Sequence, residues 1–348
     1  MPRLALAALL LAVAVAGCGI AGQAKIEAPV KVYVSLPLTG PHGPEGRDAA
    51  DGARLALEQA QGKAGSIQVR ATYLDDAKGK VWDPVAVGAN ARQAVQDSSA
   101  AAYIGELDSE PTRASVPITN DAGLVQVSPG AGGVDLTQPA TGYPDSPDRY
   151  RPSGTPNFAR TVPADTVVAD AAANWVSELG ATAALAGSDG SAFANLAAAE
   201  FRAAAGEHGI QIGPTVHGRK VALYSAVDED FTFGGQTYAV SAELDPSRLP
   251  GRDFVAHFQH RFHRAPGPYA AYGYAAIGLV LQAIDGAGTD ASSFRDNVRN
   301  GVFGAQRDGT VLGSYSITTE GDTTECAIQR YRIDGRARIP LGAPCPPH

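Results

Sequence analysis

Residues 31–36 read Lys-Val-Tyr-Val-Ser-Leu, a short run of β-forming residues that leads through Pro37 and three glycines into a segment with helical periodicity. Five apolar residues of that segment fall on one helix face: Ala49, Ala53, Ala56, Leu57 and Ala60. We therefore predict a buried strand followed by an amphipathic helix at the start of the folded chain.

The same alternation of strand and helix continues through the first half of the chain. Further strands are predicted at about 66–74, 101–104 and 124–127. Helices are predicted between them, one ending near Asp97 and one at about 112–121. Strands that alternate with helices of this length build a parallel sheet from right-handed βαβ units, so we predict an α/β lobe.

A second alternation follows a stretch rich in Pro, Gly, Asp and Ser at 130–156, which we interpret as a loop leading to a crossover. The later elements are an extended segment at 158–162, helices around 168–179 and 193–204, strands at 181–186 and 209–215, a helical region from 254 to 287, and antiparallel strands at 310–317 and 323–333. We predict two lobes, each a parallel sheet flanked by helices. Lobe 1 would hold residues 29–156 and 251–309, and lobe 2 residues 157–250 and 310–348.

The first 28 residues have a different composition, typical of a targeting segment and a tether. An apolar stretch shorter than a membrane-spanning helix ends in Val15-Ala16-Gly17-Cys18, which resembles a bacterial lipobox. We predict a signal peptide over 1–18, a tether over 19–28 and lipidation of Cys18, which would hold the protein to the outer face of the cell membrane. The alternative is an ordinary secretory signal followed by a chance cysteine.

Composition narrows the range of partners and cofactors. The net charge of −8 and the scattered basic residues disfavour a nucleic-acid partner. Apart from Cys18, the chain has Cys326 and Cys345, which we expect to form a disulfide in an exported protein. Two cysteines are too few for a zinc site, and three histidines at 257, 260 and 263 spread around their helix, so we expect no metal and no cofactor.

Several short motifs, in this order, resemble a known family. They include Leu36-Pro-Leu-Thr-Gly-Pro41, Asp75-Asp76, Tyr103-Ile-Gly105 with Ser109, Ser128-Pro-Gly-Ala131, Ser188-Asp189 with Phe193, and Tyr269-Ala-Ala-Tyr-Gly-Tyr274. The chain resembles the type I periplasmic-binding fold of branched-chain amino-acid ABC transporter receptors. The resemblance implies a monomeric, non-enzymatic receptor that closes on a small polar ligand, an amino acid or a related carboxylate or amide, and is then recognised by an ABC permease.

The resemblance also implies the residues that hold the ligand. In the first lobe these are Ser109 and the loop with Ser128, Gly130 and Ala131, and in the second lobe Phe193 would cover the ligand. Ser109 opens a helix after a strand, where free N–H groups favour an anion. The alternative interpretations are that Ser109 only caps its helix and that Phe193 is a core residue.

The chain departs from the family at three places. Gly132 stands where the family usually has a serine or threonine, and Glu45 stands where it tends to have an aromatic residue. Glu45 is therefore a candidate partner for a ligand's ammonium group, or else an exposed loop carboxylate. Between 213 and 251 the second lobe looks shortened by one β-α unit, and residues 228–230 are acidic near the place of the family's amino-group ligand, which leaves amino-acid specificity open.

Three other functions remain as alternatives. Ala186-Gly-Ser-Asp-Gly190 approximates a serine hydrolase nucleophile elbow but lacks its first glycine. Gly130-Ala-Gly-Gly133 invites a phosphate-binding interpretation but lacks the lysine and the following Ser or Thr of a P-loop. The same fold would also suit a ligand sensor, or a lipoprotein that has lost ligand binding.

Overall fold

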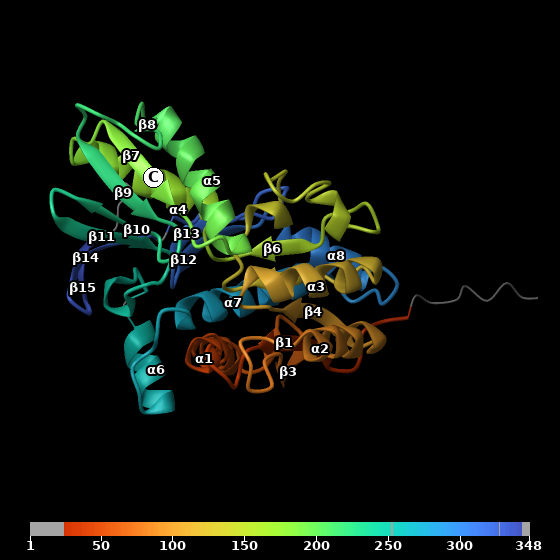
Figure 1. The fold of residues 1–348 in the computed structure, drawn as a ribbon. Coiled ribbons are helices and arrows are strands. Elements are labelled where there is room, and N and C mark those ends of the chain that lie inside the picture. Colours follow the sequence, from red (N-terminus) through yellow and green to blue (C-terminus); the bar gives the residue numbers. More distant parts are fainter. Residues whose placement is uncertain (1–23, 252, 327, 343–348) are drawn as a thin grey trace, which may run out of the picture.

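In the computed structural model, which describes residues 24–251, 253–326 and 328–342, the chain forms two lobes that are each built on a β-sheet (Figure 1). The first sheet has six strands in the order β2-β3-β1-β4-β5-β6. Their bounds are β1 Val30–Leu36, β2 Lys63–Ala64, β3 Ile67–Asp75, β4 Ala100–Ile104, β5 Gln126–Ser128 and β6 Phe158–Arg160. Strands β3, β1, β4, β5 and β6 pair in parallel, and only the short β2 is antiparallel. The parallel first sheet is confirmed.

Strand β1 is apolar on both of its faces because both faces of the sheet are covered. Val32 and Val34 belong to the main core, whereas Tyr33 points into a second core on the opposite face. This is the side-chain period of a strand buried between two helix layers. The helices of this lobe are α1 Gly43–Gln59, α2 Pro84–Gln96, α3 Ser109–Asp121, α6 Phe254–Phe262, α7 Ala270–Gly286 and α8 Phe294–Val302.

Helices α1 and α7 pack at close range because glycines face the partner backbone. A Cβ atom placed on Gly52 would lie 1.8 Å from the carbonyl oxygen of Ala270. One placed on Gly273 would lie 2.0 Å from the carbonyl oxygen of Ala49. The segment 270–286 therefore belongs to the first lobe, although it is far in sequence from α1, as we expected.

The second sheet has seven strands in the order β15-β14-β11-β10-β9-β7-β8. Their bounds are β7 Ala183–Gly187, β8 Gln211–Ile212, β9 Val221–Ser225, β10 Asp230–Phe233, β11 Gln236–Ser241, β14 Gln329–Asp334 and β15 Ala337–Gly342. Only β8, β7 and β9 are parallel, so our prediction of a parallel sheet throughout this lobe was wrong in that detail. Strands β10, β11, β14 and β15 pair antiparallel.

A tight hairpin occupies the segment where we inferred a missing β-α unit. Strands β10 and β11 are joined by Gly234 and Gly235, which both have positive φ angles, 61° and 80°. A two-residue turn with left-handed backbone at both positions matches the twist of an antiparallel pair. The glycines thus return the chain directly, and no helix is needed for a parallel crossover.

Two helices, α4 Asp165–Glu178 and α5 Ala192–Glu207, pack against the second sheet. Trp175 of α4 contacts the rings of Phe231 and Tyr238, at centroid distances of 5.3 and 4.9 Å. Phe201 of α5 stacks on Tyr224 at 3.7 Å. These aromatic contacts join both helices to the strands of the hairpin region, so this shorter lobe has its own core.

Two segments lie in the other lobe from the one we expected. Strand β6 pairs with β5 in the first sheet, although we placed residues 157 onward in lobe 2. The hairpin of β12 Gln306–Thr310 and β13 Gly313–Ser316 packs on the core of lobe 1, and Val311, Leu312 and Tyr315 are part of it. Local periodicity predicts a strand but does not say which sheet it joins, and that explains both corrections.

Two predictions, the lipidation of Cys18 and the disulfide between Cys326 and Cys345, concern the ends of the chain. Residues 1–23, with the lipobox and Cys18, lie outside the described residues. Within the described part of the chain, no helix is long and apolar enough to cross a membrane. Cys326 is disulfide-bonded, but Cys345 lies outside the described residues, so the pairing of these two cysteines stays a prediction.

Candidate functional site

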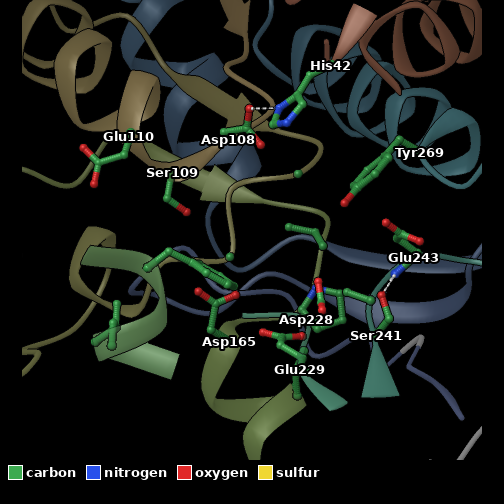
Figure 2. Close-up of a pocket in the computed structure, with 18 of the residues that line it drawn as sticks. His42, Asp108, Ser109, Glu110, Asp165, Asp228, Glu229, Ser241, Glu243 and Tyr269 are labelled. Atoms are coloured by element: carbon green, nitrogen blue, oxygen red, sulfur yellow. Dashed lines mark hydrogen bonds and ion pairs between the residues drawn. The ribbon is translucent and has the colours of Figure 1, made fainter. Parts of the chain in front are cut away.

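A cavity of about 490 Å³ lies between the two lobes. Lobe 1 contributes the loops that follow the carboxyl ends of its parallel strands, which is where open α/β sheets bind ligands. Lobe 2 contributes the N-terminal ends of α4 and α5, the turn between β9 and β10, and the end of β11 (Figure 2). The lining residues are His42, Val81, Trp82, Asp108, Ser109, Glu110, Arg113, Gly130, Gly132, Val162, Pro163, Asp165, Val168, Phe193, Leu196, Val227, Asp228, Glu229, Ser241, Ala242, Glu243, Tyr269 and Arg338.

Ser109 lies on the cavity wall, at the first residue of α3. Its hydroxyl accepts a hydrogen bond from the amide of Gly133 at 2.9 Å. The helix cap position belongs to Asp108, and Ser109 makes this contact to another loop instead. Ser109 therefore joins two of the strand-end loops of lobe 1 at the cavity.

Gly130 also lines the cavity, but Ser128 and Ala131 of the same loop are fully buried behind it. The Ser128 hydroxyl donates to the carbonyl of Glu106 at 2.6 Å and accepts from the amides of Gly130 and Ala131, at 3.1 and 2.8 Å. These two amides are thus already satisfied within the loop. Ser128 shapes the loop, and neither Ser128 nor Ala131 is among the residues that line the cavity.

Phe193 lines the cavity from α5 and is 47% exposed, so it is not a core residue. Glu45 does not line the cavity. It lies in the first turn of α1, half-buried, and its Oε2 atom is buried with no hydrogen-bond partner in the described chain. Sequence reasoning missed Trp82 and Tyr269 as lining residues, although Tyr269 opens a motif that carried the resemblance.

The cavity wall is strongly acidic. Its two arginines and His42 face six carboxylates: Asp108, Glu110, Asp165, Asp228, Glu229 and Glu243. Three of the six are paired. His42 bonds Asp108 at 2.9 Å, and this bond raises the pKa of His42 above its ordinary value. Arg338 donates to Glu243 at 2.7 Å.

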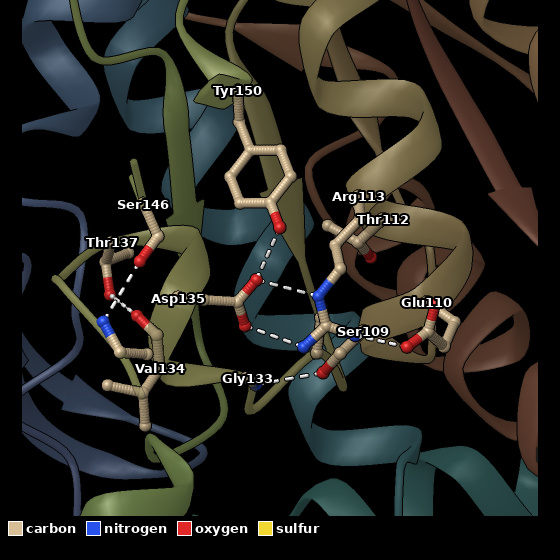
Figure 3. A network of polar contacts seen from close by, with 12 residues as sticks. Ser109, Glu110, Thr112, Arg113, Gly133, Val134, Asp135, Thr137, Ser146 and Tyr150 are labelled. Atoms are coloured by element: carbon tan, nitrogen blue, oxygen red, sulfur yellow. Dashed lines mark hydrogen bonds and ion pairs between the residues drawn. The ribbon is translucent and has the colours of Figure 1, made fainter. Parts of the chain in front are cut away.

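The third paired carboxylate belongs to a network around Arg113 (Figure 3). The guanidinium of Arg113 bonds both oxygens of the buried Asp135, at 2.8 and 2.6 Å, and Glu110 at 2.8 Å. Tyr150 donates to Asp135 at 2.6 Å. Each nitrogen of the Arg113 guanidinium therefore bonds a protein carboxylate, and Arg113 holds the loop after β5 against α3.

The other three carboxylates, Asp165, Asp228 and Glu229, all come from lobe 2. Their side chains form no hydrogen bond or ion pair with any of the described residues. Figure 2 shows the carboxylates of Asp165 and Glu229 pointing into the same part of the cleft. Burial raises the pKa of Glu229 to about 8, with Asp165 as the next cause, and burial raises the pKa of Asp165 to about 6.

Asp165 lies against Gly132, the position where a hydroxyl was missing from the sequence pattern. A Cβ atom on Gly132 would lie 2.0 Å from Oδ1 of Asp165, and the amide of Asp165 donates to the carbonyl of Gly132 at 2.9 Å. The absent side chain thus leaves room for a carboxylate of the other lobe. In the sequence, the missing hydroxyl at Gly132 pointed to an unusual wall at this place, but nothing in the sequence indicated that Asp165 would lie against it.

Behind the lobe 1 wall lie two fully buried carboxylates, Asp76 and Glu106. Tyr103 donates to one oxygen of Glu106 at 2.6 Å, whereas both oxygens of Asp76 and the Oε2 atom of Glu106 have no partner in the described chain. Burial raises the pKa of Asp76 to about 8, and the nearby Asp108 and Asp75 add to the shift. Glu106 is shifted upward as well, by burial first and by Asp76 second.

The serine and the histidines considered for other functions do not line the cavity. The Ser188 hydroxyl bonds the side-chain amide of Asn195 at 2.9 Å, and an amide is no general base for a nucleophilic serine. The side chains of His257, His260 and His263 are exposed on or next to α6. In the part of the chain that the structure describes, no three His, Cys, Asp or Glu side chains are grouped so as to hold a metal ion.

Comparison with known proteins identifies the fold. The family model described as periplasmic binding protein matches residues 29–233. A leucine complex of an ABC transporter substrate-binding protein from Desulfitobacterium hafniense is 18% identical and superposes with a TM-score of 0.67 over 90% of this chain and 100% of that chain. Leucine-binding protein LivK from Thermotoga maritima, 17% identical, gives a TM-score of 0.68 over 90% and 98% of the two chains.

A third neighbour binds a different ligand. The solute-binding protein of an ABC transporter from R. palustris, in complex with benzoate, is 17% identical and has a TM-score of 0.67 over 92% of this chain and 97% of that chain. No curated protein matches the sequence. These similarities show a two-lobed, type I periplasmic-binding fold.

Proposed function

Because the chain belongs to the periplasmic binding protein family, we propose that it is the substrate-binding lipoprotein of an ABC transporter and captures a small polar ligand between its lobes. The observation that carries this proposal is the cavity of about 490 Å³, which is lined by side chains of both lobes. A volume in this range suits a small molecule. Two of the neighbours with this fold are complexes, one with leucine and one with benzoate, so an amino acid or related small polar molecule is the first ligand class to test.

A ligand in this cavity would couple binding to lobe closure. Ser109 and Tyr269 face it from lobe 1, and Phe193 and Glu229 face it from lobe 2. A ligand gains the lobe 2 contacts only when the lobes approach each other, so it stabilises the closed arrangement by that difference in affinity. An ABC permease that recognises the closed form would then distinguish loaded from empty receptor.

We also propose that Cys18 carries the lipid anchor and that the receptor works as a monomer at the outer face of the cell membrane. The motif Val15-Ala16-Gly17-Cys18 supports the anchor. Lipid chains hold a protein at a membrane surface, with about 0.8 kcal/mol for each buried methylene. Substitution of Cys18 by Ala should release the protein from the membrane fraction, and unchanged membrane association would refute lipidation at this residue.

The test of the receptor function is thermal unfolding of the chain from Gly19 onward, which contains every element described in the structure, with amino acids, small carboxylates, amides, amines and sugars. A ligand present at about 100 times its dissociation constant should stabilise the fold by about 2.7 kcal/mol. A selective rise in Tm supports a receptor. A cooperative transition that no compound shifts would favour a lipoprotein without ligand binding.

Transport and sensing require a separate test, because both use the same cleft. Permease and ATPase genes beside this gene, together with co-purification of that permease with the full-length protein, would support transport. Selective ligand binding without such a permease would instead favour a sensor that signals to another partner.

A further inference from the structure

We propose that the inter-lobe cleft selects an organic cation, an amine or alkylammonium compound that needs no carboxylate. This inference rests on the proposed receptor function and names the ligand class of the same cavity. It depends on three features of the cavity lining: the carboxylates of lobe 2, the aromatic side chains of both lobes, and two arginines that already bond protein carboxylates.

The first argument is the charge of the wall. Asp165, Asp228 and Glu229 face the cavity without a hydrogen-bond or ion-pair partner among the described residues. Ionising Asp165 and Glu229 together in a partly dehydrated cavity is unfavourable, so these two groups take up protons more readily unless a cation accompanies them, as their raised pKa values show. A ligand ammonium would supply that charge and up to three N–H donors, and such charge-assisted hydrogen bonds are strong.

The second argument is the way in which lobe 2 holds Glu229. This residue ends the four-residue turn between β9 and β10, and its backbone is left-handed, with φ of 48°. Few non-glycine residues adopt this backbone conformation, and at the end of the turn it fixes the direction in which the side chain leaves the backbone. The turn thereby directs Glu229 toward the part of the cleft that Asp165 also faces (Figure 2).

The third argument is the aromatic part of the lining. Trp82 and Tyr269 come from lobe 1, and Phe193, which is 47% exposed, comes from lobe 2. Aromatic faces attract alkylammonium groups through their quadrupole and also cover the methylene groups that such ligands carry. The combination of unpaired carboxylates with aromatic side chains from both lobes fits an organic cation better than an inorganic ion.

The fourth argument is that the wall offers little to a ligand carboxylate. Its two arginines, Arg113 and Arg338, are engaged with Asp135, Glu110 and Glu243. The side chain of Asp165 also lies against Gly132, beside Ser109, close to the helix N-terminus that would otherwise favour an anion. A ligand carboxylate there would meet a protein carboxylate at close range.

The experiment measures binding by isothermal titration calorimetry to the chain from Gly19 onward. The probes are 1,4-diaminobutane and choline as cations, lysine as a cationic amino acid, and leucine and benzoate as carboxylates without net positive charge. We expect binding of at least one of the two carboxylate-free cations, and no binding of leucine or benzoate. Glu229→Gln and Asp165→Asn should each weaken cation binding about 10- to 100-fold, the loss expected when a charge-assisted bond becomes neutral.

Glu207→Gln is the matched control, because Glu207 is an exposed carboxylate at the end of α5 and does not line the cavity. It should change cation affinity less than about twofold. A cooperative thermal unfolding transition of each unliganded variant shows that it is folded. Binding of leucine or benzoate, with no binding of the carboxylate-free cations, would overturn this inference but leave the receptor function standing. Cation binding that both cleft variants leave unchanged would also overturn it, and binding of no compound in the wider panel would count against the receptor function itself.

Discussion

Replacing Asp76 by asparagine should stabilise the protein, and the gain should increase with pH. Asp76 is 1% exposed, and neither of its oxygens has a partner in the described chain. Burial raises its pKa from 3.8 to about 8. The folded state keeps this proton up to a higher pH than the unfolded state does. The contribution of Asp76 to the free energy of unfolding is therefore fully present below pH 3.8 and is lost as the pH rises toward 8.

The magnitude follows from the pKa difference. Between its unfolded and folded pKa values, each pH unit costs roughly 1.4 kcal/mol of folding free energy. Asparagine does not titrate, so the stability advantage of Asp76→Asn should grow by about 2 to 3 kcal/mol between pH 5 and pH 7. Urea unfolding of the wild-type protein and of Asp76→Asn at pH 5, 6 and 7 measures this growth. Any effect of the amide that does not depend on pH cancels when the differences at the three pH values are compared.

Asp75 is the matched control, because it is the neighbouring residue with the opposite shift. Burial opposes ionisation, but hydrogen bonds from the Thr39 hydroxyl and from the amides of Ala77, Leu38 and Lys78 lower its pKa overall. Asp75→Asn should therefore destabilise the protein by about 1 to 3 kcal/mol, equally at pH 5 and pH 7. A pH-independent effect of Asp76→Asn would refute the reasoning, because it would mean that Asp76 is ionised in the folded protein over this range.

Four further substitutions test the packing and the cavity wall. Gly52→Ala should destabilise lobe 1 by about 1 to 3 kcal/mol or more in urea unfolding, because its Cβ would clash with the carbonyl of Ala270. Gly286→Ala is the control and should not destabilise it, because the space around its Cβ is open. Arg160→Met should cost about 3 to 5 kcal/mol by the same measurement, because Arg160 is fully buried and its loss leaves Asp322 without the ion pair at 2.6 Å; a change below 1 kcal/mol would contradict this assignment. Ser128→Ala should cost about 1 to 3 kcal/mol, since two loop amides, that of Gly130 and the buried one of Ala131, lose their acceptor; full stability would mean that water replaces it. Ser109→Ala should lower stability by only about 1 kcal/mol, because it removes the single bond from the Gly133 amide at the cavity; a larger loss would indicate a structural role beyond that contact.

The candidate site was predictable only where it depends on chain topology. Ser109 and Gly130 follow parallel strands, and the carboxyl ends of such strands meet at one edge of a sheet, so their place at the cavity could be anticipated. Ser128 and Ala131 belong to the same loop, yet the loop turns them inward. Sequence position does not show which side of a loop faces a cavity.

The sequence by itself determined the elements of this protein, because side-chain periodicity is a local property. The run 31–36 with its following helix, the repeated alternation and the motifs near 103–109 and 128–131 were enough to predict two α/β lobes and their family. Only the tertiary structure decided that β6 joins the first sheet and that a glycine hairpin completes the second. It alone also decided that Asp165 meets Gly132 across the cleft, because a contact between distant residues depends on how two lobes dock, and no local pattern records that.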